Sequence, residues 1–281
     1  MSQLIQIRQR IKAIETIQKI THAMRLISMS SHSRLRAQEE AIITYKEKIQ
    51  KIIQAIPKKN FALTPFVSKQ KNSLHLIIIV GSQKGLCGSF NNTLASFFYK
   101  NHSRNDSYHT IFVGKKAQLV FQEHSLSPKE WFVLNSFEQL SPSSFSQTAQ
   151  DITNVICNAP ISYTSVITYS MYPKSFFVQE PHITQITPCD TLLQTQQSLS
   201  NDMIWDTKPE EIAQYLFPFY IQSAVLHILY NSLLAEYAAR FVSMDSATRN
   251  AHHLLESTQL IYNKLRQAKI TKELTELTGA L

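Results

Sequence analysis

The stretch that decides the fold is LHLIIIVGSQKGLCG, at residues 74–88. Residues 74–80 are apolar except for one histidine and end in four β-branched side chains, which predicts a strand buried on both faces. The loop that follows, residues 81–88, holds three of the five glycines of the chain. Residues 89–100 then carry a helical pattern. A buried strand, a glycine-rich turn and a helix in this order are typical of an α/β domain.

The same alternation continues along the chain. Further strands are expected at residues 108–113, 131–135 and 164–169. Helices are expected at residues 115–123 and 145–157, whereas residues 177–188 should be extended and broken by Pro181. Strands that alternate with helices predict a Rossmann-like domain with a largely parallel sheet, and we place this central α/β domain at residues 58–208.

A long helical pattern precedes the α/β domain. Between Ile5 and Ile56 the sequence contains neither glycine nor proline. Apolar residues return there at steps of three and four, at Ile7, Ile11, Ile14, Ile17, Ile20, Met24 and Ile27. Pro57 ends the pattern, so residues 1–57 should form an N-terminal coiled-coil helix. At about 1.5 Å per residue it would be about 80 Å long, and it must therefore bend or find a partner along its length.

A second helical pattern follows the α/β domain, at residues 209–281. Pro209 and the acidic residues after it are typical of a helix start, while Pro218 should kink or break the helix. Farther along, apolar and small residues keep an average spacing of about 3.5, which is the pattern of a coiled-coil seam. The positions of this seam are Thr248, Ala251, Leu255, Thr258, Tyr262 and Leu265.

The economical arrangement is an antiparallel pair formed by the N-terminal and C-terminal helices. Small residues that would permit close approach are Ser28, Ser30 and Ser31 in the first helix and Ala235, Ala238, Ala239, Ser243 and Ala247 in the last. Two helices cannot cover each other completely, so the far end should stay partly exposed, at Ile5, Ile7, Leu274 and Leu277. Exposed apolar surface on a projecting tip implies a socket in another protein.

Positive charge is concentrated at the N-terminus. The chain has a formal net charge of +8, and its first 60 residues carry 12 basic and four acidic side chains. The whole excess therefore belongs to the N-terminal helix, where it would attract nucleic acid, anionic lipid or an acidic protein surface. A merely solvated helix face explains the charge equally well.

The motifs predict no catalytic residue, metal site or cofactor. The glycines of residues 81–88 fit neither GxxxxGK[ST] nor GxGxxG, so the loop is expected to be a structural turn. The adjacent His252 and His253 should point to different sides of a helix and not share a metal. The longest apolar run, residues 74–80, is too short to cross a membrane.

The cysteines and the first residues of the sequence indicate the redox state of the compartment. Cys87, Cys157 and Cys189 are too few and too scattered for a disulfide framework or a zinc site. No apolar signal core precedes the first helical pattern. We therefore expect a reducing compartment.

Two terminal stretches resemble the gamma subunit of F-type ATP synthase. The first is residues 7–38, IRQRIKAIETIQKITHAMRLISMSSHSRLRAQ. The second is residues 237–281, which contain AARFVSMDSATRNA and YNKLRQAKITKELTEL. The turn KGLCG at residues 84–88 is also similar to a short turn of that family. The resemblance covers the architecture from end to end and is loose in the middle third.

The resemblance implies a central rotor shaft. Its coiled coil would stand inside a ring of three alpha and three beta subunits, and its globular domain would contact the epsilon subunit and the c ring. The shaft would couple ion-driven rotation to ATP synthesis and hydrolysis at the beta subunits, with no active site of its own. The expected location is peripheral, on the cytoplasmic side of a bacterial inner membrane.

The resemblance also assigns roles to individual residues. Those expected at beta-subunit contacts are Met24, Arg25, Arg240, Arg266, Gln267 and Thr271. The structural turn is expected at Gly85, Leu86, Cys87 and Gly88.

Two other functions remain as alternatives. A basic coiled-coil arm could bind nucleic acid, although aromatic residues are not interleaved with the N-terminal basic residues. A nucleotide-using α/β enzyme is the second alternative, and it would place the nucleotide at the glycine-rich loop.

Overall fold

The computed structural model describes residues 2–56, 74–101, 107–124, 132–137, 144–158, 163–188 and 207–278. The chain divides into two compact units. The terminal unit consists of Met1–Ser30 and Arg240–Leu281, and the central unit consists of Ser31–Ala239. The predicted boundary at residues 57 and 58 lies outside the described residues.

Five strands form one sheet in the central unit, in the order β3-β2-β1-β4-β5. β1 (Leu74–Val80) lies in the middle and pairs in parallel with β2 (Ser107–Val113) and with β4 (Ser165–Pro173). β3 (Phe132–Phe137) is parallel to β2, and β5 (Gln179–Thr187) is antiparallel to β4 at the other edge. The prediction of a largely parallel sheet is confirmed.

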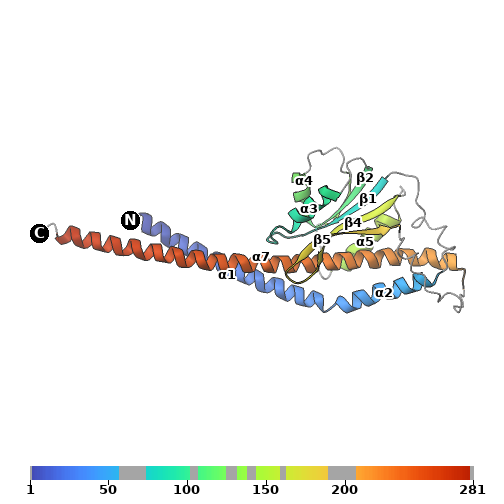
Figure 1. Cartoon of the computed structure of the whole chain (residues 1–281), viewed down its shortest axis with the longest axis horizontal. Coiled ribbons are helices and arrows are strands. Elements are labelled where there is room, and N and C mark those ends of the chain that lie inside the picture. Colours follow the sequence, from blue (N-terminus) through green and yellow to red (C-terminus); the bar gives the residue numbers. More distant parts are fainter. Residues whose placement is uncertain are drawn as a thin grey trace. The chain divides into compact units, whose positions relative to one another are not determined.

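Helices cover both faces of this sheet (Figure 1). They are α2 (Glu39–Ala55), α3 (Phe90–Asn101), α4 (Lys115–His124), α5 (Phe145–Cys157) and the first part of α7 (Pro209–Thr278). Leu76, Ile78 and Val80 of β1 join a core with α2, α5 and α7, whereas Ile77 and Ile79 join a core with α3 and α4. Burial on both faces explains why β1 is an unbroken apolar run.

The predicted single N-terminal helix is interrupted. α1 spans Ser2–Arg36, and α2 begins at Glu39. Between them the N–H of Gln38 donates to the carbonyl of Leu35, three residues back and 3.0 Å away, so the helix tightens for one turn. No glycine or proline marks this point. Leu35 and Ile42, on either side of it, are both buried in one core with Tyr230 of α7, so tertiary packing favours the interruption.

Neither internal proline breaks its element, contrary to expectation. α7 continues through Pro218, where the buried neighbours Phe217 and Ile221 anchor the helix in the core and outweigh the one hydrogen bond that proline removes. β5 continues through Pro181. Because β5 is an edge strand, a proline there need not deprive a neighbouring strand of a donor.

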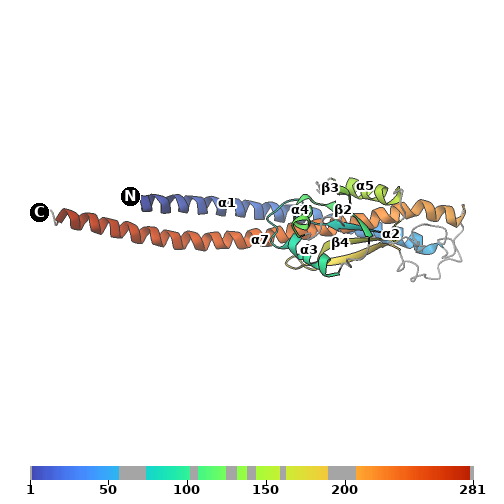
Figure 2. The same cartoon turned by 90° about the horizontal axis from the view of Figure 1, so that it is seen from above.

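The terminal unit is an antiparallel pair of helices, with both chain ends at the same end of the pair (Figures 1 and 2). The predicted seam of α7 is confirmed, because all six of its positions, from Thr248 to Leu265, are buried or half-buried. The seam is partly polar: the hydroxyl of Thr248 donates to the hydroxyl of Thr21 on α1 at 2.9 Å.

The apolar residues that predicted the helix α1 form only part of its buried seam. Ile7, Ile11 and Ile14 lie in the seam, but Ile17, Ile20 and Ile27 are more than half exposed. The seam continues instead through the small or polar residues Gln18, Thr21, Arg25 and Ser28, which are buried or half-buried. These positions keep the coiled-coil spacing, whereas the apolar side chains drift off it.

Some of the small residues of α7 serve the sheet. Ala235 and Ala239 belong to the core on the α3–α4 side of the central unit, and the Ser232 hydroxyl donates to the carbonyl of Val80 at 3.3 Å. Small side chains therefore let α7 approach the end of β1. We had expected them to face the N-terminal helix.

Among the described residues, one helix is long and apolar enough to cross a membrane by composition, which corrects the expectation based on uninterrupted apolar runs. It lies within Glu211–Thr278 of α7, and half of its most apolar window is buried. Ile221, Val225 and Leu229 of this helix pack in the core of the central unit, so part of its apolar surface is used for packing within the chain.

Candidate functional site

In the glycine-rich turn after β1, positive backbone φ angles occur at two of the four residues expected to form the structural turn. Leu86 and Gly88 have positive φ, at 65° and 63°. Gly85 has no positive φ, and a side chain there would meet nothing within 4 Å. A left-handed backbone costs a residue such as leucine about 1–2 kcal/mol, and Leu86 is nevertheless exposed. The turn therefore holds a strained, exposed leucine, which marks a candidate contact point.

A buried polar network holds this turn in place. The N–H of Ser82 donates to the Asn91 side chain at 3.0 Å, and the Asn91 amide donates back to the Ser82 hydroxyl at 2.7 Å. The Cys87 thiol donates to the same hydroxyl at 3.5 Å. The carbonyl of Ser82 also accepts the N–H groups of Lys116 and Ala117. The turn is thus bonded to both α3 and α4.

Close backbone contact makes Gly114 necessary here. It has φ +103°, and a Cβ on it would lie 2.5 Å from the carbonyl oxygen of Gly81 and 2.8 Å from that of Ser82. The ends of β1 and β2 therefore meet at two glycines.

The geometry disfavours the nucleotide alternative. In open α/β sheets, ligands bind beyond the carboxyl ends of the strands where the strand order reverses, which here is between β1 and β4. α7 already reaches this end of the sheet: the N–H of Gln83 donates to the Glu236 carboxylate at 3.4 Å. Glu236 is only 3% exposed. A buried carboxylate at that place would repel a phosphate.

Arg25, an expected beta-subunit contact, has a partner in its own chain. Its Nη1 lies 2.7 Å from Oδ1 of Asp245, across the helix pair of the terminal unit. The two side chains are 28% and 26% exposed. Asp245 also pairs with Arg249 at 3.1 Å. An outside carboxylate could reach Arg25, but it would compete with Asp245. Met24 beside it is half-buried.

Arg240 differs from the other predicted contact residues because it is only 3% exposed. Its side chain offers almost no surface to a partner. Any role in coupling would therefore be exerted from inside the chain. The sequence around residue 240 contains no signal that would predict a buried arginine there instead of an exposed one.

The predicted contacts near the C-terminus lie on an open surface. Arg266, Gln267 and Thr271 are all exposed. Neighbouring lysines are paired within the helix, Lys269 with Glu273 and Lys272 with Glu276. Arg266 makes no ion pair with any described residue, so its charge is available to a partner.

The N-terminal basic residues are available in the same way. Those of the first part of α1 are all exposed and form no ion pair with a described residue: Arg8, Arg10, Lys12 and Lys19. Water now solvates these charges, so a partner's carboxylates could pair with them without breaking an ion pair between described residues.

The terminal unit carries an apolar surface, and the sequence predicted it only at the tip, where the exposure of Ile5, Leu274 and Leu277 is confirmed. Its members are exposed large side chains, namely Ile5, Ile17, Ile20, Leu26, Ile27 and Met29 of α1 and Leu254, Leu260, Ile261, Ile270, Leu274 and Leu277 of α7. We call this set the outer apolar surface. A strict seven-residue repeat of Ile7, Ile11 and Ile14 continues at residues 18 and 21, so it would have excluded Ile17 and Ile20 from the seam.

The histidine pair is a further correction. His252 and His253 converge on Glu256, with His–carboxylate distances of 3.4 and 3.7 Å. One ligand atom from each residue lies within 4.8 Å of the others. We had expected the histidines to diverge, but both can turn toward a residue three or four positions away. All three are exposed, and no other observation points to a metal.

Neither of the described cysteines forms a disulfide bond. Cys87 is buried and Cys157 is half-buried, and burial raises the pKa of the Cys157 thiol. A raised pKa makes that thiol less reactive. Cys189 lies outside the described residues.

Comparisons with known proteins agree on one family. Residues 3–281 match the model of the ATP synthase family. Two curated relatives are ATP synthase gamma chains, from Ruminococcus albus and Methylacidiphilum infernorum. Each is 29% identical; the matches cover 100% and 98% of this chain and 98% and 97% of the relatives.

Solved structures share the fold. A chain of the Euglena gracilis mitochondrial ATP synthase, from a structure of its OSCP, F1 and c-ring, has a TM-score of 0.67 at 16% identity. The match covers 99% of this chain and 93% of that one. A chain from the central stalk and c-ring of the Tetrahymena thermophila enzyme has a TM-score of 0.62 at 20% identity, covering 81% and 99%.

Proposed function

The chain belongs to the ATP synthase family, in which its relatives are gamma chains, and on this premise we propose that it is the central shaft of a rotary ATP synthase. The terminal unit would stand inside a ring of three alpha and three beta subunits. The central unit would contact an epsilon subunit and the c ring. Rotation of the c ring would turn the shaft and drive the beta subunits through different nucleotide-binding states.

The observation that carries this proposal is the composition of the terminal unit's surface. It combines the outer apolar surface with cations that have no ion-pair partner among the described residues. Apolar contacts are non-directional and can slide, and partly solvated ion pairs contribute only about 0–1 kcal/mol each. Contacts of both kinds can be broken and remade at every step of a rotation.

The asymmetry of the pair provides the coupling. A single shaft presents different side chains to three identical sites. Each beta subunit would then meet a different set of contacts, and these differences in interaction energy would bias its conformation. Arg266, Gln267 and Thr271 are the exposed residues that we assign to this role, with Met24 and Arg25 at a second contact.

We also propose that the shaft performs no bond chemistry. The place where a Rossmann-like sheet would hold a nucleotide is reached by Glu236 of α7. Attachment to the membrane would be indirect, through the c ring, on the cytoplasmic side of a bacterial inner membrane.

The test is assembly with the cognate subunits. The chain is co-expressed with the alpha and beta subunits of its own organism, and the product is analysed by native mass spectrometry and ATPase assay. A 3:3:1 complex that hydrolyses ATP is the expected result. A folded chain that stays apart from alpha and beta would overturn the proposal, and salt-sensitive nucleic-acid binding would then be measured.

A further inference from the structure

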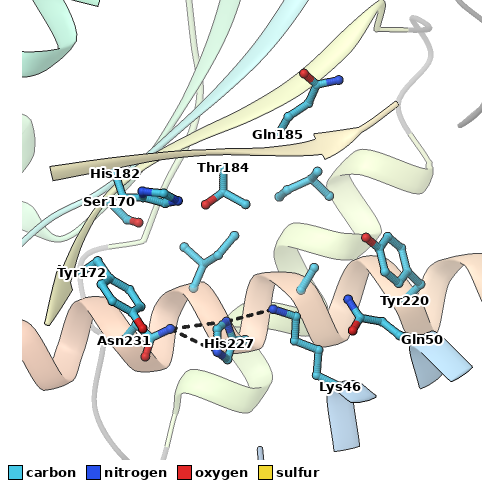
Figure 3. A pocket seen from close by; sticks show the side chains of 13 residues that line it. Lys46, Gln50, Ser170, Tyr172, His182, Thr184, Gln185, Tyr220, His227 and Asn231 are labelled. Atoms are coloured by element: carbon cyan, nitrogen blue, oxygen red, sulfur yellow. Dashed lines mark hydrogen bonds between the residues drawn. The ribbon is translucent and has the colours of Figure 1, made fainter. Parts of the chain in front are cut away.

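A partly polar, partly open cavity of about 280 Å³ lies within the central unit, lined by none of the residues of the glycine-rich turn. Four elements line it, two helices and two strands (Figure 3). Lys46 and Gln50 come from α2, Tyr220, His227 and Asn231 come from α7, and the remaining polar side chains come from β4 and β5. Those strand residues are Ser170, Tyr172, His182, Thr184 and Gln185.

The cavity contains a lysine but no carboxylate to pair with it. No aspartate or glutamate is among the lining residues. Lys46 is half-buried, and its contact is with His227, whose Nδ1 lies 3.3 Å from the lysine Nζ. It forms no ion pair with any described residue. Removing an ammonium group from water without a counter-charge is unfavourable, and the pKa of Lys46 is accordingly lowered by burial.

His227 does not supply the negative counter-charge, because an imidazole ring is either neutral or positively charged. Burial, together with the nearby Lys46, lowers its pKa to about 4, so the imidazole is neutral at pH 7. A neutral ring accepts one hydrogen bond from the lysine through the unprotonated Nδ1. An ammonium group has three donors, so the remaining two can point to an acceptor in the cavity.

Other donors converge on the same space. The Asn231 Nδ2 lies 3.3 and 3.2 Å from the two ring nitrogens of His227, on the other side of that ring from Lys46 (Figure 3). The hydroxyl groups of Ser170, Tyr172 and Thr184 come from the opposite wall. One cation, several neutral donors and no acid are the chemistry that recognises an anion.

We propose that this cavity is a binding site for a small oxyanion, with inorganic phosphate as the representative ligand. Lys46 supplies the charge, and the amide and hydroxyl groups donate hydrogen bonds to the oxygens. The volume of the cavity limits the size of its ligand. At about 280 Å³, it is just below the range of pockets that enclose drug-sized ligands, so a free oxyanion fits better than a whole nucleotide.

The experiment uses the full chain at constant ionic strength and follows inorganic phosphate binding by isothermal titration calorimetry. Wild type should bind phosphate, and Lys46→Met should weaken binding by about tenfold or more, because a charge-assisted hydrogen bond is lost. The matched control is Lys48→Met. It removes an exposed lysine from the same helix and makes the same change in net charge, and it should leave the affinity unchanged.

A second variant distinguishes a loss of phosphate binding from a folding defect. Asn231→Asp has nearly the same size and would place a carboxylate beside His227 in the same cavity, where it would repel an anion, so it should abolish phosphate binding while the melting temperature is kept. ADP serves as the second probe, and it should bind more weakly than phosphate. Equal phosphate affinities in wild type, Lys46→Met and Asn231→Asp would overturn the proposal, because binding would then be elsewhere. No measurable binding by wild type would also overturn it.

Discussion

The two halves of α7 differ in how much of their surface is buried. Between Ile221 and Ala239 nearly every side chain is buried or half-buried, on cores that lie on both faces of the sheet. Beyond Ala251 only a narrow seam is covered, and Leu254, Leu260 and Ile261 stay exposed. The difference teaches that one continuous helix can act as a core element in one unit and as a contact surface in the other.

The largest expected effect tests this contrast with a matched pair. Ile221→Ala removes a side chain that is 0% exposed, so it should destabilise the chain by about 2–5 kcal/mol through lost burial and a cavity. Ile261→Ala makes the same chemical change at a site that is 51% exposed, and it should stay within about 0.5 kcal/mol. Urea unfolding of the isolated chain measures both, and equal effects would remove the distinction between the two halves.

The second effect concerns the glycines. Gly114→Ala forces a side chain into a positive-φ position and against the carbonyl of Gly81, which should cost about 1–3 kcal/mol or more. Gly85→Ala places the same methyl group in open space and should change stability by no more than about 0.5 kcal/mol. The free energy of unfolding decides between them. A neutral Gly114→Ala would mean that the ends of β1 and β2 are not in close contact.

A smaller effect is expected in the terminal unit. A double-mutant cycle with Arg25→Met and Asp245→Asn should give a coupling energy below about 1 kcal/mol, because both side chains are partly solvated. The coupling should shrink as salt is added. Arg249, which is 70% exposed in its own pair with Asp245, is the control and should couple less. A strong, salt-independent coupling would make this pair a rigid clamp and count against a surface of weak contacts.

The substitution that should affect the isolated chain least should affect the assembled complex most clearly. Combining Arg266→Ala with Gln267→Ala should leave the free energy of unfolding within about 0.5 kcal/mol, since both side chains are exposed. In the assembled complex it should lower ATP turnover without preventing assembly. The control changes the exposed neighbours Asn263 and Lys264 to alanine. Unchanged turnover, or an equal loss in the control, would argue against a specific coupling contact at these residues.

Prediction from sequence succeeded where the pattern is local. β1 occupies its expected residues, and the α7 seam is buried or half-buried at each predicted position. It was less successful on α1, where Ile17, Ile20 and Ile27 looked like seam residues and are exposed. The partner of Arg25 could not be inferred, because Asp245 is 220 residues away along the chain.

By itself the sequence determined the order of strands and helices, the excess charge of the N-terminal helix and the family. These follow from periodicity, composition and motifs, which are properties of neighbouring residues. Tertiary structure alone decided the interruption after Arg36, the continuity of α7 through Pro218 and the burial of Glu236 and Arg240. Each of these depends on how distant segments pack. The burial of apolar neighbours outweighs the local preference of the chain at the first two places, and it also offsets the cost of burying the two charged side chains.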